Sequence, residues 1–182
     1  MSGTDKQISK FLSLILRHRP QVVGIVLEKD GWVKVETLLE ALEKQKRGIS
    51  LSDIQRVVAE NDKQRFAFSE DGLRIRANQG HSVKVQLNHP VAQPPEKLFH
   101  GTATKFLNTI LRDGLRKMKR HHVHLSASIE TASKVGVRHG ELVLLQVESG
   151  KMSLDGHVFY CSANGVWLVD HVPPQYLSLL DV

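Results

Sequence analysis

The feature that most constrains the fold is residues 88–97 (NHPVAQPPEK), a segment without hydrophobic periodicity that holds three of the six prolines in this 182-residue chain. Proline lacks the amide hydrogen that helices and inner strands use, so such a run is typical of a linker. The hydrophobic pattern differs on its two sides. We therefore predict an α+β protein of two lobes, residues 1–90 and 96–182, joined by a linker at 88–97.

The first half of the chain predicts three helices followed by a hairpin. Apolar residues recur with helical spacing from Ile8 to Leu16, and we expect Thr4 or Asp5 to cap this helix and Pro20 to stop it. The pattern then predicts a strand at 31–35, a helix at 37–46 ended near Gly48, a helix opened by a capping box at 52–55 and running to 60, and strands at 65–69 and 73–77 around an Asp-Gly turn. This order is typical of a winged helix, an architecture that often binds nucleic acid.

The second half mixes short strands and helices. We expect strands at 98–100, 122–125 and 142–147, helices at 104–112 and 129–135, and a hairpin with strands at 157–162 and 166–170. Gly114 is expected to end the first of these helices. The pattern favours a second α+β lobe.

The composition of the chain indicates which classes of partner it binds. The formal net charge is +6, which favours an anionic partner such as nucleic acid or a phosphorylated ligand. Cys161 is the one cysteine, so no intramolecular disulfide forms, and no apolar run approaches the ~18 residues of a membrane span. We expect a soluble cytoplasmic monomer with no membrane partner.

Two cationic groups in the first half allow two interpretations each. Arg17-His18-Arg19 ends the first helix, where cations either complement the helix dipole or, at Arg17 and His18, form an oxyanion site. Arg65, Arg74 and Arg76 belong to the predicted hairpin, either as a solvated surface or as an arginine comb on a phosphate backbone.

In the second half, the first candidate site is the stretch 99–106 (FHGTATKF). A strand that runs through His100, Gly101 and Thr102 into a helix is a natural seat for an anion or a carboxamide. Such a short stretch is a weak signal by itself.

The second candidate is the histidine-rich stretch 118–128. His122 and His124 share a strand face, but no acidic residue or cysteine stands at ligand spacing, so we predict no metal. Arg120 is placed to reach a phosphate, and Ser126 either binds a sugar hydroxyl or caps the next helix. Arg138, in a Gly-x-Arg-x-Gly stretch, and Asn164-Gly165 fit simple turns by their spacing.

Six blocks of the sequence, in this order, resemble the RNA 2′-phosphotransferases of the KptA type. The blocks are SKFLSLILRHRP, KQRFAFSEDGLRIRANQGHS, LFHGT, MKRHHVHLS, KVGVRHG and NGVWLVD. The resemblance runs from about Ile8 to Tyr176. It implies an N-terminal winged-helix lobe that binds RNA and a C-terminal lobe of the ADP-ribosyltransferase fold that binds NAD, with the active site between them.

The resemblance also implies an activity and its residues. In that family an internal RNA 2′-phosphate is transferred to NAD⁺ through a 2′-phospho-ADP-ribosylated RNA, giving 2′-OH RNA, ADP-ribose 1″,2″-cyclic phosphate and nicotinamide, without a metal. The family's catalytic Arg-His-Arg-Arg set corresponds to Arg17, His18, Arg65 and Arg120. The implied NAD contacts are His100, Gly101, Thr102, His124, Ser126, Arg138, Asn164 and Gly165.

Two other functions fit the same residues. One is an ADP-ribosyltransferase that modifies terminal phosphates of nucleic acids and stops at the adduct. The other is a winged-helix nucleic-acid-binding protein with an inert second lobe, which would bind nucleic acid in a salt-dependent way without consuming NAD⁺.

Overall fold

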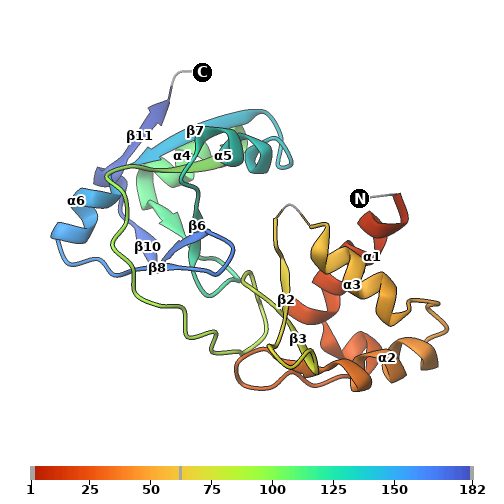
Figure 1. Cartoon of the computed structure of the whole chain (residues 1–182). Helices are drawn as coiled ribbons and strands as arrows, with labels where there is room; N and C mark the ends of the chain where they lie inside the picture. Colours follow the sequence, from red (N-terminus) through yellow and green to blue (C-terminus); the bar gives the residue numbers. More distant parts are fainter. Residues whose placement is uncertain (1–2, 62, 181–182) are drawn as a thin grey trace. The chain divides into compact units, whose positions relative to one another are not determined.

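The computed structural model of the chain describes residues 3–61 and 63–180, which separate into two compact units, 1–88 and 89–182 (Figure 1). Each unit has its own hydrophobic core. The division falls at the start of the segment predicted to be a linker. The lobe ranges and their functions stay predictions.

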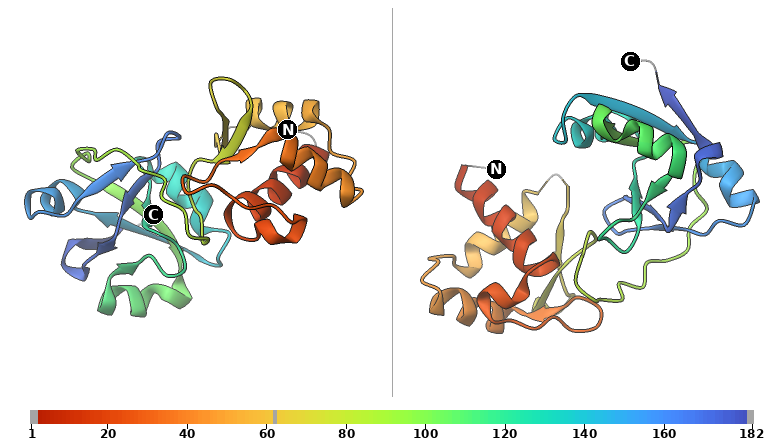
Figure 2. Two further views of the ribbon diagram at one scale, coloured as in Figure 1. Left: turned by 90° about the horizontal axis from the view of Figure 1, so that it is seen from below. Right: turned by 180° about the vertical axis from the view of Figure 1, so that it is seen from behind.

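Unit 1 contains three α-helices and a small sheet. Its elements are α1 (Gly3–Arg17), the 3-10 helix η1 (Pro20–Val23), β1 (Val33–Lys34), α2 (Val35–Lys44), α3 (Leu51–Ala59), β2 (Phe66–Phe68) and β3 (Arg74–Ala77). The sheet order is β1-β3-β2 and both pairs are antiparallel. The three α-helices gather beside this sheet (Figures 1 and 2).

The periodic face of α1 supplies much of the core of unit 1. Leu12, Ile15 and Leu16 are fully buried, together with Leu38 of α2 and Ile54 of α3. The helix ends at Arg17, three residues before Pro20, because the residue before a proline disfavours helical backbone angles. The predicted helix stop and the predicted hairpin are both confirmed.

The predicted helix starts in unit 1 were wrong. Helix α1 begins at Gly3, so both Thr4 and Asp5 lie inside it. Asp5 is 3% exposed and accepts hydrogen bonds from the Arg56 guanidinium of α3 at 3.0 and 3.1 Å. The capping box consists of Ser50 and Asp53, not of residues 52–55. The helix predicted at 37–46 also begins two residues earlier, at Val35, and shortens the preceding strand.

Unit 2 is built of short antiparallel strands with helices packed against them. Its elements are β4 (Leu98–Ala103), α4 (Thr104–Asp113), β5 (Leu115–Arg116), β6 (Val123–Leu125), α5 (Ile129–Gly136), β7 (Leu142–Val147), α6 (Ser149–Leu154), β8 (Phe159–Cys161), β9 (Trp167–Val169), β10 (His171–Val172), η2 (Pro174–Tyr176) and β11 (Leu177–Leu180). The strand orders are β11-β7-β4, β6-β9-β8 and β10-β5. Phe99 and Ser126 exchange backbone hydrogen bonds of 2.8 and 2.9 Å, which connect the two three-stranded sheets.

The proline-rich segment before β4 is anchored to unit 2. The Ala92 amide donates to the carbonyl of Phe159 at 3.0 Å, and the Cys161 amide donates to the carbonyl of Pro90 at 3.3 Å. Further on, the Gly150 amide donates to the carbonyl of Glu96 at 2.9 Å. Prolines fit here because this segment lies beside β8, at the edge of the sheet β6-β9-β8, and needs few amide donors of its own.

The closest approach between helix and sheet in unit 2 needs two glycines. A Cβ atom on Gly101 of β4 would lie 1.9 Å from the carbonyl oxygen of Ala132 in α5, and one on Gly136 would lie 2.4 Å from a methyl carbon of Leu142. Gly101 therefore lets the backbone of α5 pack directly on β4.

The chain is thus an α+β protein, as predicted from its sequence. None of the helices in residues 3–61 and 63–180 is long and apolar enough to cross a membrane.

The substitution Gly101→Ala tests the packing of α5 on β4. We expect it to lower the free energy of unfolding by about 3 kcal/mol, because the added methyl group forces α5 and β4 apart. Thermal or urea unfolding measures the change. Gly3→Ala is the control, since no atom lies within 4 Å of a Cβ there and its stability should not fall; equal stability of Gly101→Ala and wild type would contradict this account of the packing.

Candidate functional site

The first cluster of predicted site residues lies at the end of α1 in unit 1. Arg17 is half-buried and its guanidinium Nη2 donates a hydrogen bond to the backbone carbonyl of Arg65 at 3.3 Å. The same guanidinium lies 5.8 Å from the ring centroid of Phe66. The end of α1 and the start of β2 are thereby joined, although they are 48 residues apart in sequence.

A buried amide orients the Arg65 side chain. Asn61, 3% exposed, accepts a hydrogen bond from Arg65 Nη1 at 3.1 Å, and its own Nδ2 donates to the hydroxyl of Ser9 in α1 at 3.3 Å. A buried polar group is costly unless it is paired, so these contacts fix the amide and, through it, the guanidinium.

The loop after β3 holds both arginines. At its start, the Asn78 amide nitrogen donates to the Arg65 carbonyl at 2.9 Å and its side chain donates to the Gln64 carbonyl at 2.6 Å. At its end, the Ser82 amide donates to the Arg17 carbonyl at 2.9 Å, and the Ser82 hydroxyl lies 2.9 Å from Nδ1 of His18. We call residues 78–82 the clamp loop. It brings Arg17, His18 and Arg65 together within unit 1.

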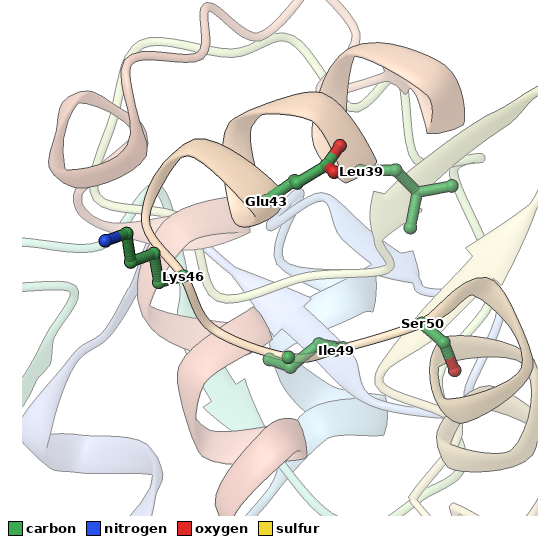
Figure 3. Close-up of a pocket in the computed structure, with 6 residues that line it drawn as sticks. Leu39, Glu43, Lys46, Ile49 and Ser50 are labelled. Atoms are coloured by element: carbon green, nitrogen blue, oxygen red, sulfur yellow. The ribbon is translucent and has the colours of Figure 1, made fainter.

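A pocket of unit 1 lies at a different place. Figure 3 shows it between the end of α2 and the start of α3, and its volume is about 490 Å³. Its lining residues are Leu39, Glu43, Lys46, Gly48, Ile49 and Ser50. No residue from the predicted site is among them.

The second cluster lies in unit 2 around His100. Nδ1 of His100 donates to the backbone carbonyl of His124 at 3.0 Å. Burial lowers the pKa of His100, and the positive charge of Arg120 lowers it further, while the hydrogen bond to His124 acts in the opposite direction. The neutral ring with hydrogen on Nδ1 is therefore favoured, which leaves Nε2 as a hydrogen-bond acceptor.

Arg120 belongs to the same cluster. Its Nη1 lies 3.3 Å from Nδ1 of His124, so the guanidinium donates and the His124 ring accepts. Desolvation lowers the pKa of Arg120, but an arginine remains charged at neutral pH. Unit 2 thus joins Arg120, His124 and His100 in one row, and Ser126 follows on the same short strand.

The remaining predicted contacts have local structural explanations. His100, Gly101 and Thr102 lie inside β4, and α4 begins only at Thr104, whose hydroxyl donates to the Glu141 carboxylate at 2.9 Å. The strand through these three residues leads directly into α4, as predicted, and an anion or carboxamide site at this place stays a prediction. Their role as NAD contacts stays a prediction.

The structure also places Ser126 and the two predicted turns. The cap of α5 is Ser128, so Ser126 is not a helix cap. Arg138 is exposed in the turn after α5. Asn164 accepts a hydrogen bond from the Ser162 hydroxyl at 2.8 Å, and Gly165 has a φ of 75°, as a hairpin turn requires.

Within residues 3–61 and 63–180, no group of three histidine, cysteine, aspartate or glutamate side chains could hold a metal ion. His122 instead packs against the Tyr160 ring at 5.3 Å between centroids.

Two guanidiniums and an imidazole in one cluster are side chains of the kind that bind phosphate groups. A family model described as "RNA 2'-phosphotransferase, Tpt1 / KptA family" matches residues 3–171. The chain therefore belongs to the RNA 2′-phosphotransferase family.

Individual relatives agree with the family assignment. A protein of Hahella chejuensis, named "Probable RNA 2'-phosphotransferase", is 53% identical over 176 residues, which is 97% of this chain and 95% of the relative. A protein of Trichormus variabilis with the same name is 53% identical over 96% of this chain and 96% of its own length. One of Rhodopirellula baltica, also with this name, is 51% identical over 96% of this chain and 97% of its own length.

Sequence analysis missed how the cluster in unit 1 is held. Asn61 was not singled out, and no local pattern marks it. Asn78 and Ser82 are bonded to the backbone and side chains of the cluster, through contacts between residues far apart in the sequence.

The substitution Asn78→Ala tests the clamp loop. The variant keeps the backbone bond to the Arg65 carbonyl but loses the side-chain bond to the Gln64 carbonyl, which loosens the residue before Arg65. We expect 2′-phosphotransferase activity to fall about 10- to 100-fold, because a small displacement of Arg65 is costly for a reaction that depends on positioning. The measurement is kcat/KM at a temperature where thermal unfolding shows the variant to be folded. Gln79→Ala, the neighbouring change, should retain activity; full activity of a folded Asn78→Ala protein would contradict the positioning role.

Proposed function

We propose that the chain is an NAD-dependent RNA 2′-phosphotransferase that removes an internal 2′-phosphate from RNA. The observation that supports it best is the cluster in unit 1, in which the clamp loop holds the backbones of Arg17 and Arg65 and the ring of His18. A dianionic phosphate needs such a set of fixed cationic donors. In this proposal unit 1 is a winged-helix RNA-binding lobe and unit 2 is an ADP-ribosyltransferase-like lobe.

In the first proposed step, Arg17 and Arg65 hold the RNA 2′-phosphate as a nucleophile. One of its oxygens forms a bond to C1″ of the nicotinamide ribose of NAD⁺, and the bond from C1″ to nicotinamide breaks. The phosphate oxygen is already deprotonated, so this step needs orientation and charge neutralisation more than a general base. The adduct is 2′-phospho-ADP-ribosylated RNA.

In the second step the ribose 2″-hydroxyl gives its proton to water and forms a bond to phosphorus, and the bond from phosphorus to the RNA 2′-oxygen breaks. The guanidiniums, with Arg120 among them, stabilise the charge that builds at phosphorus. His18 gives the departing 2′-oxygen its proton. The products are 2′-OH RNA, ADP-ribose 1″,2″-cyclic phosphate and, from the first step, nicotinamide.

The residues of unit 2 fit NAD⁺ as the co-substrate. A neutral His100 offers an acceptor at Nε2 to a hydroxyl or amide of the dinucleotide without adding positive charge beside the cationic nicotinamide. Arg120 supplies the positive charge that a pyrophosphate or the transferred phosphate needs. His124 and Ser126 complete the polar lining, and Arg138, Asn164 and Gly165 are proposed as further contacts.

An RNA with one internal 2′-phosphate tests the proposal. We expect conversion to 2′-OH RNA only when NAD⁺ is present, with one nicotinamide and one ADP-ribose 1″,2″-cyclic phosphate formed per phosphate removed. Arg65→Ala should lower the rate by about 100-fold or more while the protein stays folded, and chromatography with mass spectrometry of the products measures both.

The control for the variant is Arg112→Ala, because Arg112 is exposed and pairs with its neighbour Asp113 at 2.9 Å. Phosphate release without NAD⁺ would contradict the proposed reaction. An adduct that accumulates with wild-type protein and goes no further would favour an ADP-ribosyltransferase that stops after the first step.

A further inference from the structure

The outward face of the sheet in unit 1 carries a group of cations and one indole ring. In β3 the buried Ile75 and Ala77 point to the core, so Arg74 and Arg76 point outward. Lys34 pairs with Arg74 in the register of β1 and β3 and is exposed. Trp32, two residues before Lys34, lies on the same face. We call Trp32, Lys34, Arg74 and Arg76 the sheet-face patch.

The indole of Trp32 holds the two guanidiniums in place. Arg76 lies 4.5 Å and Arg74 lies 5.5 Å from its ring centroid. A cation over an aromatic ring is a favourable arrangement that limits side-chain freedom. Both arginines are half-buried, so each keeps part of its surface accessible.

One acidic residue lies beside the patch. Glu28 approaches Arg74 at 3.5 Å, and the two side chains are 46% and 41% exposed. An exposed pair of this kind contributes little and exchanges readily for another anion. The pair therefore leaves Arg74 able to bind a phosphate.

The patch is continuous with the proposed reaction site of unit 1. Arg76 pairs with Ala67 in β2, and the Asn78 amide bonds to the carbonyl of Arg65, which extends the same pairing by one step. Arg65 comes directly before β2, and its guanidinium is held by the buried Asn61 amide. The patch and Arg65 are therefore neighbours along the pairing of β2 with β3.

We propose that the sheet-face patch binds the phosphate backbone of the single-stranded RNA that flanks the 2′-phosphorylated nucleotide. This inference rests on the proposed function, because it starts from a nucleotide held at Arg65. The charge is complementary to RNA, and same-face residues spaced about 6.5 Å apart along a strand offer successive cations to one chain. The outer surfaces of stacked guanidiniums also accept unstacked bases, which favours a single strand over a duplex.

Direct binding tests this proposal without relying on turnover. Fluorescence anisotropy of a dye-labelled 12-nucleotide single-stranded RNA without a 2′-phosphate gives Kd at several salt concentrations. We expect Arg76→Gln to weaken binding about 5-fold and to reduce the slope of log K against log salt by about 0.7, the loss of one phosphate contact to a single strand.

Arg47→Gln is the matched control. Arg47 also lies over an aromatic ring, 4.4 Å from the centroid of Phe11, and its loss also removes one positive charge, but it follows α2 and lies outside the patch. Its Kd and salt slope should stay close to those of wild type. Equal weakening in the two variants, or an unchanged slope in Arg76→Gln, would overturn the proposal. Preference for duplex RNA or for DNA over single-stranded RNA would overturn its assignment of the partner.

Turnover separates this inference from the proposed function. With 2′-phosphorylated substrates, Arg76→Gln should raise KM more for a 12-nucleotide RNA than for a dinucleotide, because only the longer RNA reaches the patch. If wild-type protein removes the phosphate but this difference is missing, the inference fails and the proposed function stands. If wild-type protein binds RNA through the patch but removes no phosphate, the proposed function fails.

Discussion

The structure of the site in unit 1 depends on one backbone carbonyl, that of Arg65. It accepts hydrogen bonds from the Arg17 guanidinium and from the Asn78 amide, and so joins the end of α1, the start of β2 and the clamp loop. Each of these segments also has an independent anchor: the core face of α1, the antiparallel pairing of β2 with β3, and the bond from Ser82 to Arg17. Two guanidiniums that would otherwise repel each other are therefore fixed by neutral oxygens before any ligand arrives.

The clusters of the two units differ in their charge. Unit 1 supplies fixed positive charge at Arg17 and Arg65, together with an exposed imidazole at His18. Unit 2 supplies a half-buried histidine whose pKa is lowered and whose ring is oriented by a backbone carbonyl, next to an arginine. A site for phosphate needs the first arrangement, and a site for the cationic ring of a dinucleotide is better served by the second. Preorganised groups of this kind do not have to be reoriented during the reaction.

Much of the fold could be predicted from the sequence because its elements follow local rules. The spacing from Ile8 to Leu16 identified α1, Asp71-Gly72 identified the hairpin, and Gly114 ended α4. Other features depend on distant partners, since β5 and β10 are each two residues long and pair with each other. The start of α3 was misjudged locally: Ser50, not Ser52, is the cap, and the helix begins one residue after it. In the site, Arg17, His18 and Arg65 were candidates by residue type and position, and the resemblance assigned them to one catalytic set. Asn61 could not be found because its role depends on Ser9 and Arg65 meeting in space.

The central claim is that the cluster at the end of α1 recognises the 2′-phosphate itself. Calorimetric titration of the full chain, without NAD⁺, with an RNA dinucleotide that carries an internal 2′-phosphate and with the same dinucleotide lacking it, measures this recognition directly. The account predicts at least about 10-fold tighter binding of the phosphorylated RNA, corresponding to one charge-assisted contact, and loss of that difference in Arg17→Gln. Equal affinity for the two dinucleotides, or a difference that survives in Arg17→Gln, would contradict it.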